Sequence, residues 1–330
     1  MKNNIKNILI LNTGGGLGDS LQHLTLFNYL NENINPDKIY FFSTDGKRFW
    51  YDNILKEFAP KNLEVVKTFP MHFGFQFRDH LYAKKLINSF DFEKFDLIID
   101  NQTRITNTLM YKRIPHKYFI SPCYSYFFSK PFFLMKKPKH AILRIINYLN
   151  KLLKINESIS YNLTIPENYL AQAKKILNPK DKYVGFSITS AHRQNIKEFN
   201  FDEIFEVANY FASKDLIPIF FIDNSRPEIK NRIKESVKNC MFPEDMADKE
   251  FKNPMLVTAL GSLTEFNISI NNGIYHMLNY SNKKTYMFAA DLSEKFKSLH
   301  QDFKIFNGKA KKMPLGKLSS SQIINFIENN

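Results

Sequence analysis

The glycine-rich segment 13–19 (TGGGLGD) lies near the amino terminus and ends in the carboxylate of Asp19. Its glycines, among them Gly15, Gly16 and Gly18, allow a tight turn and a close approach of the backbone to a ligand. A dinucleotide-binding fingerprint would place a third glycine at the position of Asp19, so this fingerprint is broken at its last position. Asp19 either caps the helix that follows or acts as a general base toward an incoming hydroxyl group. Because a carboxylate here repels a pyrophosphate, we favour the general base.

A second polar segment begins at the end of the apolar run 183–188 (YVGFSI). Ligands bind at the carboxyl ends of strands in open α/β sheets, and hydroxyl groups beside an Arg and a Lys suit phosphate oxygens. The alternative interpretation is a solvated basic loop. The candidate phosphate-binding residues are Ser187, Thr189, Ser190, His192, Arg193 and Lys197.

Two further strand ends carry polar side chains. Asn271, Asn272 and Gly273 directly follow an apolar run, so the N–H groups of the helix expected there could receive an anion. His276 would lie on the first turn of that helix, although a single histidine usually has a structural role. Another polar stretch follows the apolar run 95–100 and either binds a hydroxylated substrate or closes a turn. Its residues are Asp100, Asn101, Gln102 and Arg104.

Several catalytic and metal-binding motifs are absent from the sequence. It contains no HExxH, GxxxxGK[ST] or GxSxG pattern, and no paired His/Asp spacing that would hold a metal ion. It also lacks a DxD element of the kind that holds a nucleotide-bound cation. The sequence therefore offers no motif for a bound metal ion.

Apolar runs alternate with helical patterns along most of the chain, which argues for parallel, doubly wound sheets. The pattern changes near residue 127 and restarts at residue 183, which indicates two Rossmann-like domains. We place the first at residues 1–160, a linker at 161–178 and the second at residues 179–330. The expected strands are 7–12, 38–43, 63–66, 95–100, 183–188, 217–222, 255–260, 266–270 and 285–288.

The chain has a formal net charge of +14 at pH 7. A basic excess favours polyanionic partners, such as nucleic acid, an anionic membrane face or a phosphorylated substrate. Because no nucleic-acid-binding module is present and the basic residues look dispersed, nucleic acid is not expected. Cys123 and Cys240 are too few for a disulfide framework, and no segment has the ~18 apolar residues of a membrane span. We therefore expect a cytoplasmic protein.

Residues 127–154 mix aromatic side chains with Lys and Arg. Ile142, Ile145, Leu149 and Leu152 lie at helical spacing, so a basic amphipathic helix is expected. One interpretation is that this face rests on the anionic inner leaflet of a membrane. The other is that the helix packs its apolar stripe on the core and turns its lysines outward.

Taken together, these segments resemble glycosyltransferase family 9, the heptosyltransferase family of lipopolysaccharide assembly. The first matching segment resembles the family's opening strand and G-D-x-L turn, and the second its strand-plus-Arg segment. The segment 183–211 is similar to the phosphate loop of the family's second domain, and 216–233 is similar to the next strand with its acidic residue, here Glu228. The segment 259–288 is similar to the D-T-G-x-x-H signature. The five segments are 8–24, 95–120, 183–211, 216–233 and 259–288.

The resemblance implies a GT-B fold, in which two Rossmann-like domains with parallel sheets face each other across a cleft. It implies inverting, metal-independent transfer from a nucleotide-sugar, preferably ADP-linked, to a glycan or lipid-linked acceptor. Asp19 would be the general base, and Lys197 would neutralise the donor phosphates. The implied donor-binding residues are Ser187, Thr189, Ser190, Arg193, Lys197, Asn271, Asn272, Gly273 and His276. The implied acceptor-binding residues are Gly15, Gly16, Gly18, Gln22 and Arg104.

The sequence departs from the family pattern in the donor region. Asn271 and Asn272 stand where the family has Asp-Thr, which removes a carboxylate near the donor. UDP and GDP therefore stay open as alternatives to ADP. Two other classes also stay open: a divergent, non-catalytic basic protein that binds nucleotides or polyanions, and a nicotinamide-dependent oxidoreductase, against which Asp19 argues.

Overall fold

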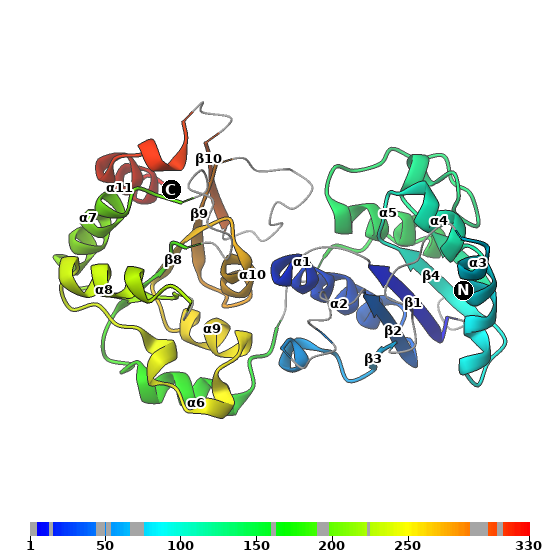
Figure 1. The fold of residues 1–330 in the computed structure, drawn as a ribbon, viewed down its shortest axis with the longest axis horizontal. Helices are drawn as coiled ribbons and strands as arrows, with labels where there is room; N and C mark the ends of the chain where they lie inside the picture. The colour runs from blue at the N-terminus through cyan, green and yellow to red at the C-terminus, as the bar shows by residue number, and fades with distance from the viewer. Residues whose placement is uncertain are drawn as a thin grey trace. The chain divides into compact units, whose positions relative to one another are not determined.

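The described part of the chain forms two compact α/β units, one up to residue 159 and the other from residue 163 onward (Figure 1). Each unit is built on a parallel five-stranded sheet, as the alternation of strands and helices predicts. The computed structural model describes residues 5–12, 16–43, 50, 54–66, 76–159, 163–189, 198–222, 225–290, 303–308 and 313–330.

The sheet of the first unit has the strand order β3-β2-β1-β4-β5, and every neighbouring pair is parallel. Its central strand is almost wholly buried, as expected for a continuous apolar run with a helical layer on each face. The strands are β1 (Asn7–Asn12), β2 (Lys38–Ser43), β3 (Leu63–Val65), β4 (Phe95–Asp100) and β5 (His116–Ile120).

Successive side chains of β1 point to opposite faces of the sheet. Leu9 and Leu11 belong to a core cluster with Ala83 and Met110, on the face covered by α3 and α4. The helices α2 and α5 pack against each other in the same unit. The helices are α1 (Leu17–Leu21), α2 (His23–Asn33), α3 (Phe77–Lys85), α4 (Ile105–Tyr111) and α5 (Ala141–Leu153).

Helix α5 is the amphipathic helix that the sequence predicts within residues 127–154. Its apolar stripe, which includes Ile145, Leu149 and Leu152, is buried. Burying each such side chain stabilises the fold by about 1.5–3 kcal/mol. The interpretation in which this stripe packs on the core is therefore confirmed, and α5 itself has no apolar face left for a membrane.

The sheet of the second unit has the strand order β10-β9-β8-β6-β7, and its neighbouring strands are also parallel. Strand β6 is buried at every residue, and β8 and β9 are buried at every residue but the first. The strands are β6 (Tyr183–Ser187), β7 (Ile217–Phe220), β8 (Phe266–Ile270), β9 (Lys284–Ala289) and β10 (Phe303–Asn307).

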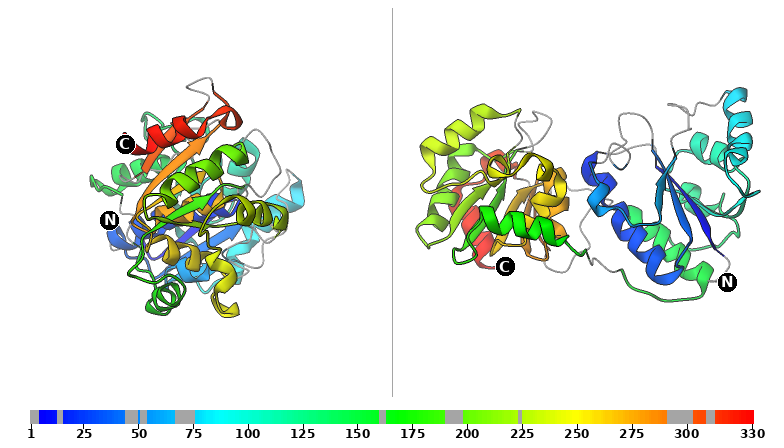
Figure 2. Two further views of the ribbon diagram at one scale, coloured as in Figure 1. Left: turned by 90° about the vertical axis from the view of Figure 1, so that its left-hand side faces the viewer. Right: turned by 90° about the horizontal axis from the view of Figure 1, so that it is seen from below.

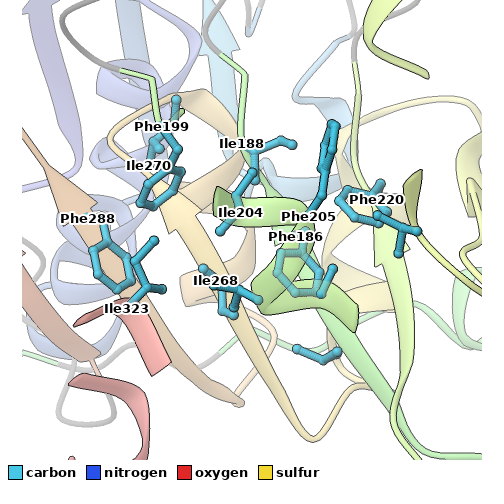
Figure 3. Close-up of a cluster of buried hydrophobic side chains, with 14 of the residues drawn as sticks. Phe186, Ile188, Phe199, Ile204, Phe205, Phe220, Ile268, Ile270, Phe288 and Ile323 are labelled. Atoms are coloured by element: carbon cyan, nitrogen blue, oxygen red, sulfur yellow. The ribbon is translucent and has the colours of Figure 1, made fainter. Parts of the chain in front are cut away.

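An aromatic and aliphatic core lies on one face of this second sheet (Figure 3). Phe186 and Phe220 from neighbouring strands stack with their ring centroids 5.0 Å apart. Helices α7 and α11 lie side by side over this core (Figures 1 and 2), while α6, α9 and α10 pack on one another. The helices are α6 (Glu167–Ile176), α7 (Phe201–Ala212), α8 (Pro227–Ser236), α9 (Pro254–Gly261), α10 (Gly273–Asn279) and α11 (Ser320–Glu328).

Two segments differ from the sequence prediction. Residues 255–260, expected as a strand, lie in helix α9, which starts with Asn253 accepting a hydrogen bond from the N–H of Met255 (3.0 Å) and with Pro254 in its first turn. Every residue of α9 is buried, so the run has no polar face that would reveal a helical period. The range 161–178, expected as a linker, contains helix α6. This helix packs against α9 and so belongs to the second unit.

The helices of the described residues are short or amphipathic. None of them is both long and apolar enough to cross a membrane.

Candidate active site

Each sheet has one position where the strand order reverses direction. In the first unit this switch lies between β1 and β4, because the chain proceeds to β2 on one side and returns to β4 on the other. In the second unit it lies between β6 and β8 for the same reason. Ligands of open α/β sheets bind outside the carboxyl ends of the strands at this point. The residues that follow these four strands are therefore the candidate site residues.

Helix α1 follows β1 in the sequence and starts at Gly16, whose extended backbone conformation makes it the N-cap. A Cβ atom built on Gly16 would meet no atom within 4 Å, so there is open space beside the turn. The side chain of Asp19, in the first turn of α1, accepts a hydrogen bond at Oδ2 from the N–H of Gly16 (2.8 Å). Asp19 thus contributes to capping from the third position of the helix, while Gly16 and not Asp19 is the N-cap.

Capping occupies one oxygen of Asp19 and leaves its side chain half-buried. Among the described residues, the other oxygen, Oδ1, has no hydrogen-bond partner. A carboxylate that is held by a backbone N–H and keeps one oxygen without a hydrogen-bond partner among the described residues can still accept a proton. The cap therefore does not exclude the catalytic role, which stays a prediction.

His23 connects this turn to the end of β4, and sequence reasoning did not single it out. Its Nδ1 lies 3.2 Å from the carbonyl oxygens of both Asp19 and Ser20, and its Nε2 lies 2.9 Å from Nδ2 of Asn101. Carbonyls only accept, so Nδ1 carries the proton and Nε2 accepts from the Asn101 amide. Burial lowers the pKa of His23 to about 4, against the opposing effects of these carbonyls and of the Asp19 charge. His23 is therefore a neutral cross-link between the two strand ends.

A second cross-link and a buried carboxyl group lie beneath the same edge. The side-chain amide of Gln102 donates to Oδ1 of Asn12 at the end of β1 (3.1 Å), while its backbone N–H donates to Asp100 (2.9 Å). Asp100 also accepts hydrogen bonds from Thr108 (2.5 Å) and Ser121 (2.8 Å). Burial raises its pKa to about 7, although the three hydrogen bonds act in the opposite direction. The polar stretch after β4 thus closes the turn and fixes the first switch point.

The remaining predicted acceptor-side residues take different positions. Gly18 is buried within α1, and Gln22 lies between α1 and α2 with a buried Nε2 that has no partner among the described residues. Arg104 is exposed at the N-cap of α4. Gly15 lies outside the described residues.

At the second switch point, one asparagine joins the ends of β6 and β8. Asn272 is the N-cap of α10, where its Oδ1 accepts from the N–H of Tyr275 (3.0 Å). Its Nδ2 donates to Oγ of Ser187 (2.7 Å) and to the carbonyl oxygen of Thr189 (2.8 Å). Ser187 and Thr189 are buried. The structure therefore brings together three of the residues that the sequence predicted for donor binding.

The other predicted donor-side residues are only partly visible. Gly273 is the first residue of α10, Asn271 precedes it half-buried, and His276 is buried with its ring 3.8 Å from that of Tyr275. Four residues lie outside the described part of the chain, namely Ser190, His192, Arg193 and Lys197.

Glu198, which follows those residues, takes part in a charge cluster that sequence reasoning missed. Its buried carboxylate lies 3.3 Å from Nη1 of Arg226, whose Nε donates to Glu228 (2.7 Å). Arg226 thus ties the start of α8 to the segment before α7. Among the described residues, no group of three or more His, Cys, Asp or Glu is placed to hold a metal ion.

Comparisons with known proteins find likeness in structure but not in sequence. No protein-family model matches the chain, and no curated protein matches its sequence.

Solved structures match over nearly the full length. A glycosyl transferase family 9 structure from Veillonella parvula is 17% identical over 100% of this chain and 98% of its own, with a TM-score of 0.70. E. coli ADP-heptose lps heptosyltransferase II is 11% identical over 98% of both chains (TM-score 0.66). E. coli heptosyltransferase WaaC with ADP is 16% identical over 98% of this chain and 97% of its own (TM-score 0.64). The chain therefore has a GT-B fold of the kind seen in family 9 heptosyltransferases.

Proposed function

We propose that this protein is a glycosyltransferase that moves a sugar from a nucleotide diphosphate to a hydroxyl group of a glycan or lipid-linked acceptor in cell-envelope polysaccharide synthesis. The observation that carries the proposal is that the two switch points have different polar groups, charged at the first and uncharged at the second. The first has the half-buried carboxylate of Asp19, one oxygen of which caps α1, and the second has uncharged amide and hydroxyl groups at Asn272 and Ser187. Transfer from a diphosphate needs a base for the acceptor and an anion-tolerant site for the donor.

In the proposed reaction Asp19 is the catalytic residue. Its carboxylate takes the proton of the acceptor hydroxyl while that oxygen forms a bond to the anomeric carbon of the donor sugar. The bond from this carbon to the diphosphate breaks at the same time, and the diphosphate leaves with the electron pair. Attack opposite the leaving group inverts the configuration at the anomeric carbon.

The donor diphosphate is placed at the second switch point. Ser187, Thr189 and Asn272 form its polar floor. The basic residues that follow in the sequence, Arg193 and Lys197, would balance the charge of the leaving diphosphate. We expect neither a metal ion nor a cofactor.

An ADP-linked donor is favoured because two structures of similar fold, WaaC and heptosyltransferase II, are described with ADP or as ADP-heptose enzymes. GDP- and UDP-linked sugars are the alternatives. We place the reaction on the cytoplasmic side of the membrane. Non-catalytic binding of a nucleotide or another polyanion remains the second candidate, because Asn271 and Asn272 replace the acidic signature.

A thermal-shift series with ADP-, GDP- and UDP-linked sugars tests the proposal. A donor present at 100 times its Kd stabilises the folded protein by about 2.7 kcal/mol, so the correct nucleotide class stands out from the others. Incubation with envelope glycans and the stabilising donor should then release the free nucleotide diphosphate. Stabilisation without any turnover would support non-catalytic nucleotide binding, and no stabilisation by any sugar nucleotide would contradict the proposed transferase.

A further inference from the structure

The positive charge of the protein is concentrated in one stretch of the first unit. Residues 101–156 contain eleven Lys and Arg and no Asp or Glu, so this stretch carries a charge of +11 out of +14 for the whole chain. The interpretation of the basic residues as dispersed is therefore wrong. Within this stretch lies the segment 124–139, between β5 and α5, which we call the aromatic–basic segment.

The aromatic–basic segment presents large apolar side chains to solvent. Tyr124, Phe127, Phe132 and Leu134 are 68%, 66%, 54% and 85% exposed. The rings of Phe127 and Phe132 lie together, with their centroids 6.3 Å apart. Exposed lysines are interspersed among them, at positions 130, 136 and 139. Clustered aromatic and apolar groups among lysines, without acidic residues, mark an interaction surface.

The segment is exposed although its backbone is held firmly. Lys130 exchanges two backbone hydrogen bonds with Phe119 of β5 (3.0 and 2.8 Å). The side chain of Arg144 in α5 donates to the carbonyl oxygens of residues 138 and 139 (2.8 and 2.7 Å). Buried Tyr126 donates to the carbonyl oxygen of Arg144 (2.8 Å). A surface that is fixed in this way loses little conformational entropy when a partner binds.

The turn at the start of the segment separates the inward from the outward side chains. Tyr124, Ser125 and Tyr126 have positive φ values of 44°, 53° and 70°. Non-glycine residues rarely adopt this conformation, and each costs of order 1–3 kcal/mol. The turn directs Tyr126 into the core, while Tyr124 and Phe127 on either side are exposed. The fold thus maintains a strained turn that leaves two aromatic side chains in solvent.

We propose that the aromatic–basic segment is a membrane-contact surface that docks on anionic phospholipid. Lysines are attracted to the negative surface of such a bilayer, while aromatic and aliphatic side chains enter the interface between headgroups and acyl chains. Nucleic acid explains the charge and could stack on the rings, but it offers no partner for Leu134, which is the most exposed of these apolar residues.

The segment lies at the edge of the sheet that carries Asp19, so a membrane contact there would bring an acceptor to the proposed base. This step rests on the proposed function. The segment begins just after the carboxyl end of β5, and in a parallel sheet this end lies at the same edge as the turn of Asp19 and the end of β4. Ser121, which follows β5, donates to Asp100 of β4 (2.8 Å). A lipid-linked acceptor in the docked bilayer would therefore present its glycan at the edge that carries the proposed base.

Co-sedimentation of the full chain with vesicles tests the surface. Vesicles of phosphatidylcholine alone are compared with vesicles of equal parts phosphatidylcholine and phosphatidylglycerol. We expect binding to the anionic vesicles only. The double variant Lys130→Gln/Lys136→Gln should reduce the partition coefficient by more than tenfold, because each lysine contributes about a factor of five. Phe127→Ser/Phe132→Ser should reduce it by at least about tenfold.

Matched controls use exposed residues of the second unit. Lys174→Gln/Lys249→Gln and Met246→Ser remove the same kinds of side chain elsewhere and should leave vesicle binding unchanged. Failure of the wild type to bind anionic vesicles would overturn the proposal. So would equal losses in the control and segment variants, or a preference for a single-stranded oligonucleotide over vesicles.

The thermal shift with nucleotide-sugars, measured on the same variants, separates the two proposals. Vesicle binding without a donor shift would leave the surface standing and contradict the proposed function. A donor shift without vesicle binding would support the proposed function and contradict the membrane-contact surface.

Discussion

The two switch points use the same strand-turn-helix element but place different groups at the start of the helix. At the first, the carboxylate of Asp19 accepts a hydrogen bond from the N–H of Gly16. At the second, the side-chain amide of Asn272 accepts a hydrogen bond from the N–H of Tyr275 and donates one to Ser187. Both solve the capping problem, but only the amide does so without a charge. The choice of capping group thus separates a site suited to a hydroxyl nucleophile from a site that tolerates a diphosphate.

The strongest challenge to this distinction is Asp19→Asn. The asparagine keeps an oxygen that can accept the N–H of Gly16, but it cannot take a proton. We expect the transfer rate to fall roughly 10³-fold, within the range of general-base catalysis, while the melting temperature changes little. Turnover of the purified variant near the wild-type rate would show that Asp19 is only a cap.

The pH dependence of stability probes the buried groups beneath the first switch point. The pKa of Asp100 is raised to about 7, so between about pH 4 and 7 the folded state holds a proton that the unfolded state has released. Asp100 therefore makes the free energy of unfolding decrease by roughly 4 kcal/mol as the pH rises through this window.

His23 should act in the opposite direction. Its pKa is lowered to about 4, so between about pH 4 and 6.5 the unfolded state holds the extra proton, and the free energy of unfolding rises by roughly 3 kcal/mol with pH. Denaturant titration followed by the fluorescence of the single tryptophan, Trp50, which packs on Phe27 in this unit, measures the free energy of unfolding at each pH.

Asp100→Asn should remove the decrease in this free energy between about pH 4 and 7. His23→Gln should remove its increase between about pH 4 and 6.5. Parallel pH profiles for wild type and variants would contradict these assignments.

A close cross-strand pair supports the second switch point. Gly185 of β6 lies opposite Asn267 of β8, and a Cβ atom on Gly185 would come within 2.2 Å of Oδ1 of Asn267. Both polar atoms of this fully buried side chain lack a partner among the described residues. We expect Gly185→Ala to destabilise the protein by roughly 2–3 kcal/mol through overpacking.

Adding Asn267→Ala to Gly185→Ala should restore most of that stability, because it removes the clashing group. Thermal unfolding by circular dichroism measures both variants. An unchanged melting temperature in Gly185→Ala, or no recovery in the double variant, would show that this pair does not limit the packing of β6 and β8.

A smaller effect separates the two tasks of Asn272. Threonine is also a good N-cap but has no N–H to donate to Ser187 and Thr189. Asn272→Thr should therefore cost about 1 kcal/mol, and Asn272→Ala about 1 kcal/mol more, because it also removes the cap. Equal melting temperatures for the two variants would mean that the cap contributes nothing there.

The sequence predicts the central strands because they are buried on both faces and end at polar or glycine residues. The bounds of β1, β4 and β8 agree with the prediction at every residue. Strands β5 and β10 were not predicted; β5 begins with the polar residues His116 and Lys117 and is buried only at its last two residues, so it lacks a continuous apolar run. Residues 255–260 were predicted as a strand but lie in α9, because every residue of this helix is buried and its sequence therefore shows no helical alternation of polar and apolar residues.

The candidate site was predicted only in part, for a related reason. Asp19 and Asn272 stand beside glycines at strand ends, where the local pattern reveals them. The link from His23 to Asn101 spans 78 residues and depends on the pairing of β1 with β4. No local pattern contains such a contact, although the histidine four residues after Asp19 was a usable signal.

Donor binding measured by calorimetry, with the nucleotide-sugar that gives the thermal shift, tests the division between the two switch points most directly. We expect Asp19→Asn to bind this donor with the wild-type Kd, and Asn272→Ala to bind it at least about tenfold more weakly, a loss of about 1.4 kcal/mol. Weaker donor binding by Asp19→Asn together with unchanged binding by Asn272→Ala would contradict the assignment of the base to the first unit and the donor to the second.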